Sequence, residues 1–288
     1  MRLSPVPRMS SADRFRLQFV PSVSIPMDNV SFARPSFLAG VELVSATYGA
    51  RRFPIHTHDT YVVGTVTGGA ERLDVGRARH VVAQGSVLRL HPEEAHSNCS
   101  LGSEPLSYRV FYLSEKGIQP YLRAEESLRF TAPVIADRHL GARLAALHCV
   151  LSAEATLRLE QESAMATLVE LLGPSRGNNG ERPVGSSAVI RRVQEFVDAY
   201  HRDDFGLTTL AEVAGLSVYR FAHLFKMVTG LSPIAYRNQC RIRASRPLLL
   251  DGQPIASIAL DLGFADQSHF TRHFQRIVGV SPARYRQQ

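Results

Sequence analysis

The sequence of 288 residues predicts an α+β protein, with an N-terminal β-barrel and helical hairpin followed by an all-α domain with two helix-turn-helix units. Three observations support this class. Short apolar runs broken by glycines fill residues 36–113, which is typical of antiparallel strands. Leucines and alanines recur at helical spacing over 137–172. One turn motif then occurs twice, as GLSPIAYR at 230–237 and GVSPARYR at 279–286.

The N-terminal part begins with an arm and continues as strands. We expect residues 1–30 to be partly ordered, because they contain prolines and show no clear periodicity. Apolar runs of strand length follow, at VELVSATY (41–48), TYVVGTV (60–66), RHVVAQGSVLRL (79–90) and YRVFYL (108–113). Turn signals separate these runs, so they predict an antiparallel sandwich or barrel.

The helical hairpin over 137–172 completes this β-domain, and its two helices are expected to join near residues 152–155. The helices either cover the core of the β-domain or form a dimer interface, and the two roles are compatible. The segment GPSRGNNGERPVGSS that follows is rich in Gly, Pro, Asn and charge, which is typical of a linker. The predicted boundaries are an arm at 1–30, a β-domain at 31–172, a linker at 173–186 and a helical domain at 187–288.

The charge is concentrated at the C-terminal end. The net charge of +7 is carried almost entirely by arginine, since only Lys116 and Lys226 are lysines. Residues 186–288 hold 13 basic against 8 acidic side chains, a net +5, whereas residues 1–185 hold a net +2. A basic balance favours an anionic partner, with nucleic acid ahead of a membrane surface. An arginine-rich proteome is the alternative explanation.

The cysteines and the hydropathy indicate a cytoplasmic protein. Cys99, Cys149 and Cys240 are too few and too scattered for a disulfide framework, which fits a reducing interior. The N-terminus has no apolar run of signal-peptide length. No segment approaches the roughly 20 apolar residues of a membrane span, so we expect no membrane partner.

The duplicated turn lies inside a longer internal repeat. The sequence LAEVAGLSVYRFAHLFKMVTGLSPIAYR (210–237) aligns with IALDLGFADQSHFTRHFQRIVGVSPARYR (258–286). The pairs Phe221/Phe270 and Gly230/Gly279 are 49 residues apart. Several coincidences at one offset indicate one duplicated unit rather than two unrelated helical hairpins.

Each copy has the residues of a helix-turn-helix. Gly215 and Gly263 stand where the first helix ends, in a backbone conformation that a side chain would disfavour. The expected N-terminal caps are a Thr209–Glu212 capping box, Ser217 and Asp266. Ile234 to Leu250 would form a connecting helix of about 25 Å, which would hold two recognition helices near one DNA turn, about 34 Å, apart. Pro247 should kink this helix.

Residues 187–288 resemble the DNA-binding domain of AraC/XylS-family transcription regulators, and IASIALDLGFADQSHFTRHFQRIVGVSPARYR carries the family pattern. The stretches RRFPIHTHDTYVVGTVTGGAERL and GSVLRLHPEEAH resemble the cupin-like effector-binding domain of the same family. The resemblance implies a cupin-like barrel that binds a small molecule and dimerises, and a tandem helix-turn-helix domain that binds double-stranded DNA. It also implies transcription activation and RNA polymerase as a further partner.

The second helix of each unit is expected to read DNA with the side chains opposite its buried stripe. These are Val218, Tyr219, His223 and Lys226 in the first unit, and Gln267, Ser268, Thr271 and Arg272 in the second. Tyr219 and His223 are placed to meet base edges and Lys226 to meet phosphate. Arg272 would pair two-pronged with guanine and Gln267 with adenine. The family usually has Arg where His223 stands, and plain surface roles stay open for both His223 and Arg272.

The motifs HTHD (56–59) and PEEAH (92–96) would bring His56, His58 and His96 to one mouth of the barrel. This arrangement resembles the metal site of cupin enzymes, but a Glu is expected where this chain has YVVG, so we predict neither a catalytic metal nor a cofactor. The favoured hypothesis is a pocket whose imidazoles donate hydrogen bonds to a polar or anionic effector. Tyr61 and Arg89 are expected in its wall, with His91 and Arg109 as looser candidates. Histidines held by turn backbone, and metal binding by the three, stay open.

These observations predict a sequence-specific DNA-binding transcription regulator, dimeric and controlled by an effector in the β-domain, and not an enzyme. Two alternatives remain. One is a metal-dependent cupin enzyme fused to a DNA-binding module. The other is a constitutive DNA-binding dimer whose β-domain only dimerises.

Overall fold

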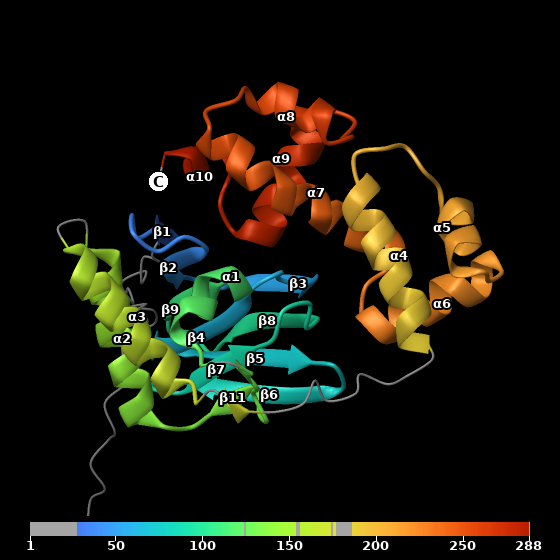
Figure 1. Ribbon diagram of the computed structural model, residues 1–288. Helices are drawn as coiled ribbons and strands as arrows, with labels where there is room; N and C mark the ends of the chain where they lie inside the picture. Colours follow the sequence, from blue (N-terminus) through green and yellow to red (C-terminus); the bar gives the residue numbers. More distant parts are fainter. Residues whose placement is uncertain (1–27, 124, 154–155, 174, 177–185, 288) are drawn as a thin grey trace, which may run out of the picture.

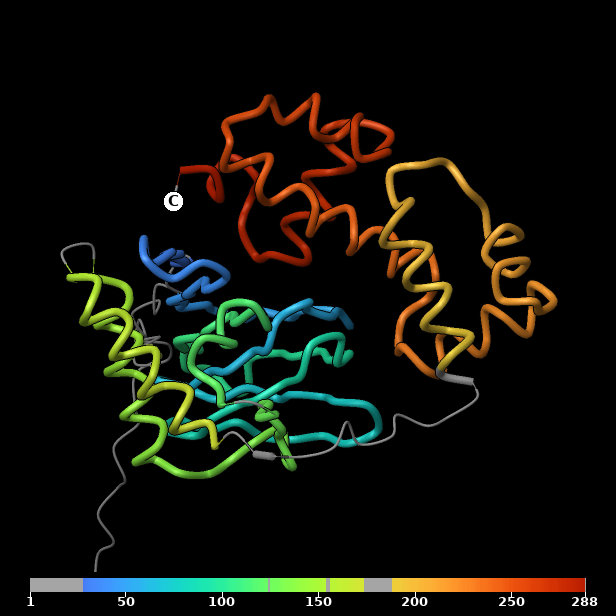
Figure 2. Tube along the Cα trace, in the orientation of Figure 1, coloured from blue at the N-terminus to red at the C-terminus, as the bar shows by residue number. Residues whose placement is uncertain are grey.

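A β-rich part is followed along the chain by a helical part, as predicted (Figures 1 and 2). The computed structural model describes residues 28–123, 125–153, 156–173, 175–176 and 186–287. The predicted arm up to residue 27 and most of the predicted linker lie outside the described residues. The domain boundaries therefore stay a prediction. None of the described helices is both long and apolar enough to cross a bilayer.

Ten of the described strands form two antiparallel sheets rather than one closed barrel, and β10 and β12 form a separate pair. The six-stranded sheet runs in the order β1 (Asn29–Ala33), β2 (Val41–Tyr48), β9 (Leu106–Leu113), β4 (Tyr61–Gly68), β7 (Val87–Leu90) and β11 (Val134–Ile135). The four-stranded sheet runs in the order β3 (Arg52–His56), β8 (His96–Leu101), β5 (Ala70–Val75) and β6 (Ala78–Ala83). The predicted run at 79–90 is thus split between the sheets, with Gly85 at φ +85° in the turn.

Alternate side chains of the six-stranded sheet enter two different cores. In β4, Val62 and Val66 share a cluster with Leu73 and Val82 of the four-stranded sheet. Tyr61 and Val63 belong to a second cluster on the outer face. The pleat, with its period of two, sends neighbouring residues to opposite faces. All residues from 61 to 66 are buried because both faces are covered.

Two helices, α2 (Arg138–Ser152) and α3 (Arg158–Leu171), cover that outer face. Leu144 of α2 and Met165 of α3 pack against Val63 and Phe111 of the sheet. The predicted hairpin therefore covers the core of the β part. Short elements complete this part of the chain, namely α1 (Glu115–Ile118), the 3₁₀ turn η1 (Gln119–Tyr121), β10 (Glu126–Ser127) and β12 (Ser175–Arg176).

The helical part consists of two similar units on one connecting helix (Figure 1). Its helices are α4 (Ser186–Tyr200), α5 (Leu207–Ala214), α6 (Val218–Thr229), α7 (Pro233–Leu250), α8 (Ile255–Asp261), α9 (Gln267–Val278) and α10 (Pro282–Arg286). Phe221 and Phe225 fill the core of the first unit, and their counterparts Phe270 and Phe274 are equally buried in the second. The sequence repeat is therefore a structural repeat, with α7 as the connector.

Glycines end the helices of both units as predicted. Gly215 and Gly263 have φ values of +67° and +74°, and Gly230 and Gly279 have +74° and +94°. This left-handed region costs little for glycine and disfavours residues with a side chain. The same backbone turn therefore occurs at equivalent places in the two copies.

The expected caps are confirmed on the second helices and wrong on the first. Ser217 and Asp266 each accept a hydrogen bond from the backbone N–H three residues later, at 3.5 and 2.7 Å. The expected Thr209–Glu212 capping box does not form, because α5 already begins at Leu207. Thr209 therefore lies within the first turn and not at the cap.

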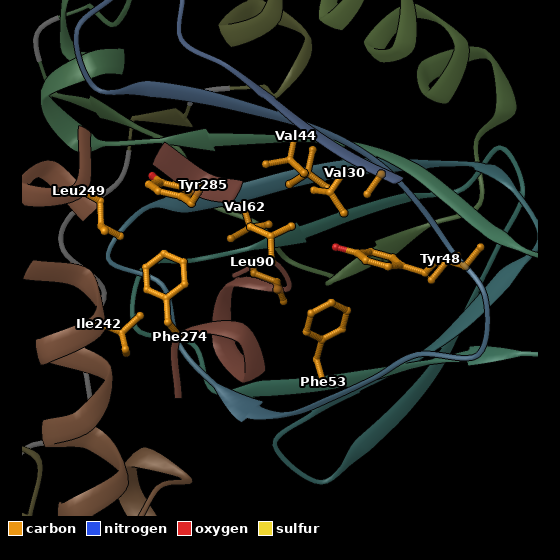
Figure 3. Packing of buried hydrophobic residues seen from close by; sticks show 14 of the residues in the cluster. Val30, Val44, Tyr48, Phe53, Val62, Leu90, Ile242, Leu249, Phe274 and Tyr285 are labelled. Atoms are coloured by element: carbon orange, nitrogen blue, oxygen red, sulfur yellow. The ribbon is translucent and has the colours of Figure 1, made fainter. Parts of the chain in front are cut away.

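The two parts of the chain share one apolar cluster (Figure 3). Ile242 and Leu249 of α7, Phe274 of α9 and Tyr285 of α10 belong to the same cluster as residues of the two sheets, such as Val62. The helical part is therefore packed directly onto the β part.

α7 continues through Pro247 to Leu250, so this proline does not end the connecting helix.

Candidate DNA-binding helices and effector cavity

The predicted DNA-facing residues of α6 lie on its exposed side. Tyr219 is 82% exposed and Val218 is 39% exposed, and His223 and Lys226 are also exposed. Ser217 fixes the N-terminus of this helix, and its aromatic stripe is buried against α4 and α5. The first unit thus presents these four side chains to solvent, as a recognition helix must.

α9 presents a similar face. Gln267, Ser268 and Arg272 are exposed and Thr271 is half-buried. His269 and His273 instead lie with their ring centroids 5.5 and 6.0 Å from that of Phe264, so they pack against this ring. These four residues lie in the N-terminal half of α9, and the helix also contacts β3.

A cavity of about 60 Å³ lies between the two sheets. On the scale where a buried water needs about 10–15 Å³, this is room for a few waters or a small polar group. Its polar and aromatic lining comprises Tyr48, Phe53, His56, His58, Glu71, His96, Asn98, Tyr108, Tyr112 and Arg246. Apolar residues from both sheets complete the lining, with Ile277 and Val278 from α9.

The three predicted histidines converge in this cavity. His56 ends β3 and His96 begins β8, and the two are paired across the strands. Their ring centroids are 4.2 Å apart. The ring centroid of His58 lies 4.9 Å from that of His56 and 5.3 Å from that of His96. Burial lowers the pKa of all three, that of His96 to about 3, so the imidazoles are neutral near pH 7.

A buried carboxyl lies in the same cavity wall. Glu71 of β5 is fully buried, and its Oε2 accepts a 2.7 Å hydrogen bond from Asn98. Its Oε1 has no partner among the described residues. Burial raises the pKa of Glu71 to about 7. The cavity thus offers a bound molecule one carboxyl oxygen whose hydrogen bonding is unmet.

Two predicted wall residues lie outside the cavity. Tyr61 and Arg89 instead pack around Phe130, with the Tyr61 ring centroid at 5.9 Å and the Arg89 guanidinium at 4.9 Å. The physical reason is the pleat, since their neighbours Val62, Leu88 and Leu90 are the residues of β4 and β7 that line the cavity. Tyr61 and Arg89 were therefore predicted on the wrong face of the six-stranded sheet.

The loops that carry the histidines are held by α7 of the helical part. Gln239 Oε1 accepts hydrogen bonds from both the N–H and the hydroxyl of Thr57, each at 2.9 Å. Arg243 pairs with Glu93 at 2.5 Å. The Glu93 N–H in turn donates to the carbonyl of His58 at 2.7 Å. Glu93 adopts a left-handed φ of +62°, a conformation that costs about 1 kcal/mol, and these partners hold it there.

Most of this connection was not predicted from the sequence, although the spacing of its residues carries a signal. Gln239, Arg243 and Arg246 recur at helical i, i+4, i+7 spacing, a pattern that indicates one polar face of α7 with a partner. Arg241 points elsewhere and donates to the carbonyls of His201 and Gly263, both at 2.6 Å. Arg241 therefore links the two helical units, whereas Arg243 links α7 to the β part.

Both halves of the chain match known protein families. Residues 38–172 match the family described as AraC-like ligand binding domain, and residues 210–288 match a helix-turn-helix domain. The uncharacterized HTH-type transcriptional regulator YbfI of Bacillus subtilis is 28% identical over 224 residues, which is 76% of this chain and 82% of that protein. The arabinose operon regulatory protein of Escherichia coli is 31% identical over 110 residues, 38% of each chain.

A solved structure shares the two-part fold. ToxT from Vibrio cholerae, solved with an unsaturated fatty acid bound, superposes with a TM-score of 0.51 at 15% identity, covering 90% of this chain and 94% of that one. The repeat, the exposed faces of α6 and α9, and the β-domain cavity agree with both family matches. The chain therefore belongs to the AraC/XylS family of transcription regulators, with an AraC-like ligand-binding domain and a helix-turn-helix DNA-binding domain.

Proposed function

We propose that a polar or anionic small molecule in the cavity controls how the two helix-turn-helix units engage DNA, and that the chain activates transcription. The observation that carries this proposal is the shared cavity wall. Arg246 of α7 and Ile277 and Val278 of α9 close a space whose other walls are the two sheets. A ligand there touches both parts, so its affinity depends on how they are docked, and its binding shifts the balance between docked arrangements.

The lining favours a short polar ligand over a long apolar one. ToxT was solved with a fatty acid. Here the volume is about 60 Å³, and the walls present three imidazoles, a buried carboxyl and the Arg246 guanidinium. Arg246 lies 3.5 Å from Glu42, which leaves guanidinium donors that suit a carboxylate or a similar anion.

We further propose that α6 and α9 enter successive major grooves. Arg272 and Gln267 would contact guanine and adenine, Tyr219 and His223 would meet other base edges, and Lys226 would meet phosphate. α7 has 18 residues, hence about 27 Å of helix, which suits two recognition helices one DNA turn apart.

A homodimer, contact with RNA polymerase and a cytoplasmic location belong to the same proposal. The helical hairpin carries exposed leucines, with Leu157 and Leu159 69% and 74% exposed, and this apolar surface suits a second copy of the chain. Activation requires that the DNA-bound chain contact RNA polymerase, and the cytoplasm is the compartment that holds both the DNA and the polymerase.

Footprinting and gel-shift titration of the full chain test the DNA assignment. We expect protection over about two turns per protomer. Arg272→Ala should weaken binding to the selected site by about 1–3 kcal/mol and relax specificity at one base pair. Arg79→Ala is a matched control, since this exposed arginine lies on β6 of the four-stranded sheet, and it should leave DNA affinity unchanged.

An Arg272→Ala protein that binds every sequence as tightly as before would refute the role of α9.

The effector assignment needs a separate measurement, a thermal-shift screen of the full chain against amino acids, sugars and organic acids. A ligand of the cavity should stabilise the chain more as its concentration rises, and should also change DNA affinity. A stabilising ligand without effect on DNA would contradict control by the cavity.

A further inference from the structure

The histidine cluster has the geometry of a metal centre. One nitrogen from each of His56, His58 and His96 lies within 4.8 Å of the other two. A tetrahedral ion with metal–nitrogen distances of about 2.0–2.1 Å brings such nitrogens to roughly 3.3 Å from one another. The nitrogens must therefore approach one another by at most about 1.5 Å, which rotations of the three side chains can supply.

Backbone hydrogen bonds fix the tautomer of two of these rings. Nδ1 of His56 lies 2.8 Å from the carbonyl oxygen of Pro54, and Nδ1 of His96 lies 2.9 Å from that of Glu94. A carbonyl oxygen only accepts, so both Nδ1 atoms carry the hydrogen. Both Nε2 atoms therefore keep a free lone pair, and no described protein group forms a hydrogen bond with them. Metal-binding histidines are oriented by the same kind of bond.

We propose that His56, His58 and His96 bind one divalent transition-metal ion, of which Zn²⁺ is the simplest case, and that the ion forms part of the effector site. Three neutral imidazoles suit zinc, copper, nickel or iron rather than magnesium or calcium, which prefer oxygen ligands. The carboxylate expected in a cupin enzyme is absent, but a three-histidine set is itself sufficient to hold zinc.

Three protein ligands leave the ion at least one open position. All three histidines line the cavity, so that position faces the space where the effector is proposed to bind. Arg246 in the same wall opposes a cation, but Glu42 partly offsets its charge at 3.5 Å. The remaining positive charge favours an anionic group as the fourth ligand. Metal binding stands on its own, whereas its link to DNA affinity rests on the proposed function.

Titration of the metal-stripped full chain tests the site. We expect one Zn²⁺ or Co²⁺ per chain by calorimetry and elemental analysis, with Co²⁺ showing the visible absorption of a nitrogen-ligated ion. His58→Ala should weaken metal affinity by at least about tenfold. His58 is the best choice because it lies outside β3 and β8 and the structure gives its ring no hydrogen bond whose loss would disturb either strand.

His139→Ala is the matched control, because His139 is exposed at the start of α2 and should leave metal binding unchanged. Circular dichroism of each variant confirms folding, and His56→Gln provides a second loss if His58→Ala is unstable. Absence of stoichiometric binding, or binding that survives both variants, would overturn the metal site. Binding that requires the histidines but leaves DNA affinity unchanged would support the site and count against cavity control.

Discussion

Replacing Gln239 by alanine should loosen the contact between α7 and the cavity loop without disturbing either part. Its Oε1 accepts two hydrogen bonds from Thr57, each at 2.9 Å, and both residues are buried. The variant leaves the N–H and hydroxyl of Thr57 without an acceptor. Each unmet buried donor costs about 1–3 kcal/mol, and the hydroxyl can rotate toward another acceptor. We therefore expect a loss of about 2–4 kcal/mol in the free energy of docking.

Hydrogen exchange of the Thr57 amide measures this loss in docking free energy. Since each 1.4 kcal/mol is tenfold, the Thr57 N–H should exchange about 30-fold to several hundred-fold faster in Gln239→Ala. The amide of Val63, inside β4 and paired with β7 and β9, should keep its exchange rate. Gln84→Ala is the control, because Gln84 bonds only to Thr67 on the exposed surface of the β part.

An unchanged rate at Thr57 would mean that the two parts are not docked through this bond in solution. Equal acceleration at Thr57 and Val63 would mean global destabilisation instead. Either result would refute the reasoning that α7 holds the histidine loop through Gln239.

Three further predictions follow from other parts of the molecule. Burial lowers the pKa of His148 to about 4, below 6.5 in an unfolded chain, so its stabilising effect is present above pH 6.5 and lost as the pH falls toward 4. When the pH falls from 7 to 4.5, the free energy of unfolding measured with urea should decrease by about 2–3 kcal/mol less in His148→Gln than in the wild type. Equal decreases in the two proteins would contradict this. Gly215→Ala should cost about 1 kcal/mol from backbone strain alone, since nothing lies within 4 Å of the added carbon. Gly263→Ala should lower Tm further, because its added carbon would lie 2.5 Å from the Arg241 guanidinium, and equal Tm losses would show that this crowding is relieved freely. Lys226→Ala should weaken DNA binding evenly across sequences and reduce the salt slope by about one, whereas a sequence-dependent loss would make Lys226 a base contact.

The helix-turn-helix units could be predicted closely because their signals are local. The glycines at Gly215 and Gly263 and the caps at Ser217 and Asp266 each act within one turn of chain. Tertiary contacts only had to bury the aromatic stripe that the spacing already indicated. The error at Thr209 is a shift of the helix start, because the N-cap is Gly206, three residues before the predicted cap.

The cavity wall could be predicted only in part, for a physical reason. β4 is buried on both faces from 61 to 66, so its sequence has no polar side to mark which face is which. Tyr61 and Arg89 were therefore assigned to the wrong face, while the histidines, in turns at the strand ends, were brought together as expected. The place of Glu71 in the wall depends on strand pairing. The helical spacing that includes Arg246 indicates a partnered face of α7 but does not identify the cavity as the partner.

The connecting helix joins the cavity to both DNA-binding units. Arg241 holds carbonyls of His201 in the first unit and Gly263 in the second. Gln239 and Arg243, on either side of it in sequence, hold the histidine loops. A helix is stiff over such a short span, so a ligand that shifts those loops must either move both units together or break these bonds. Under the proposed function, control of DNA binding therefore requires no change inside either helix-turn-helix unit, because a displacement of α7 against the β part would be sufficient.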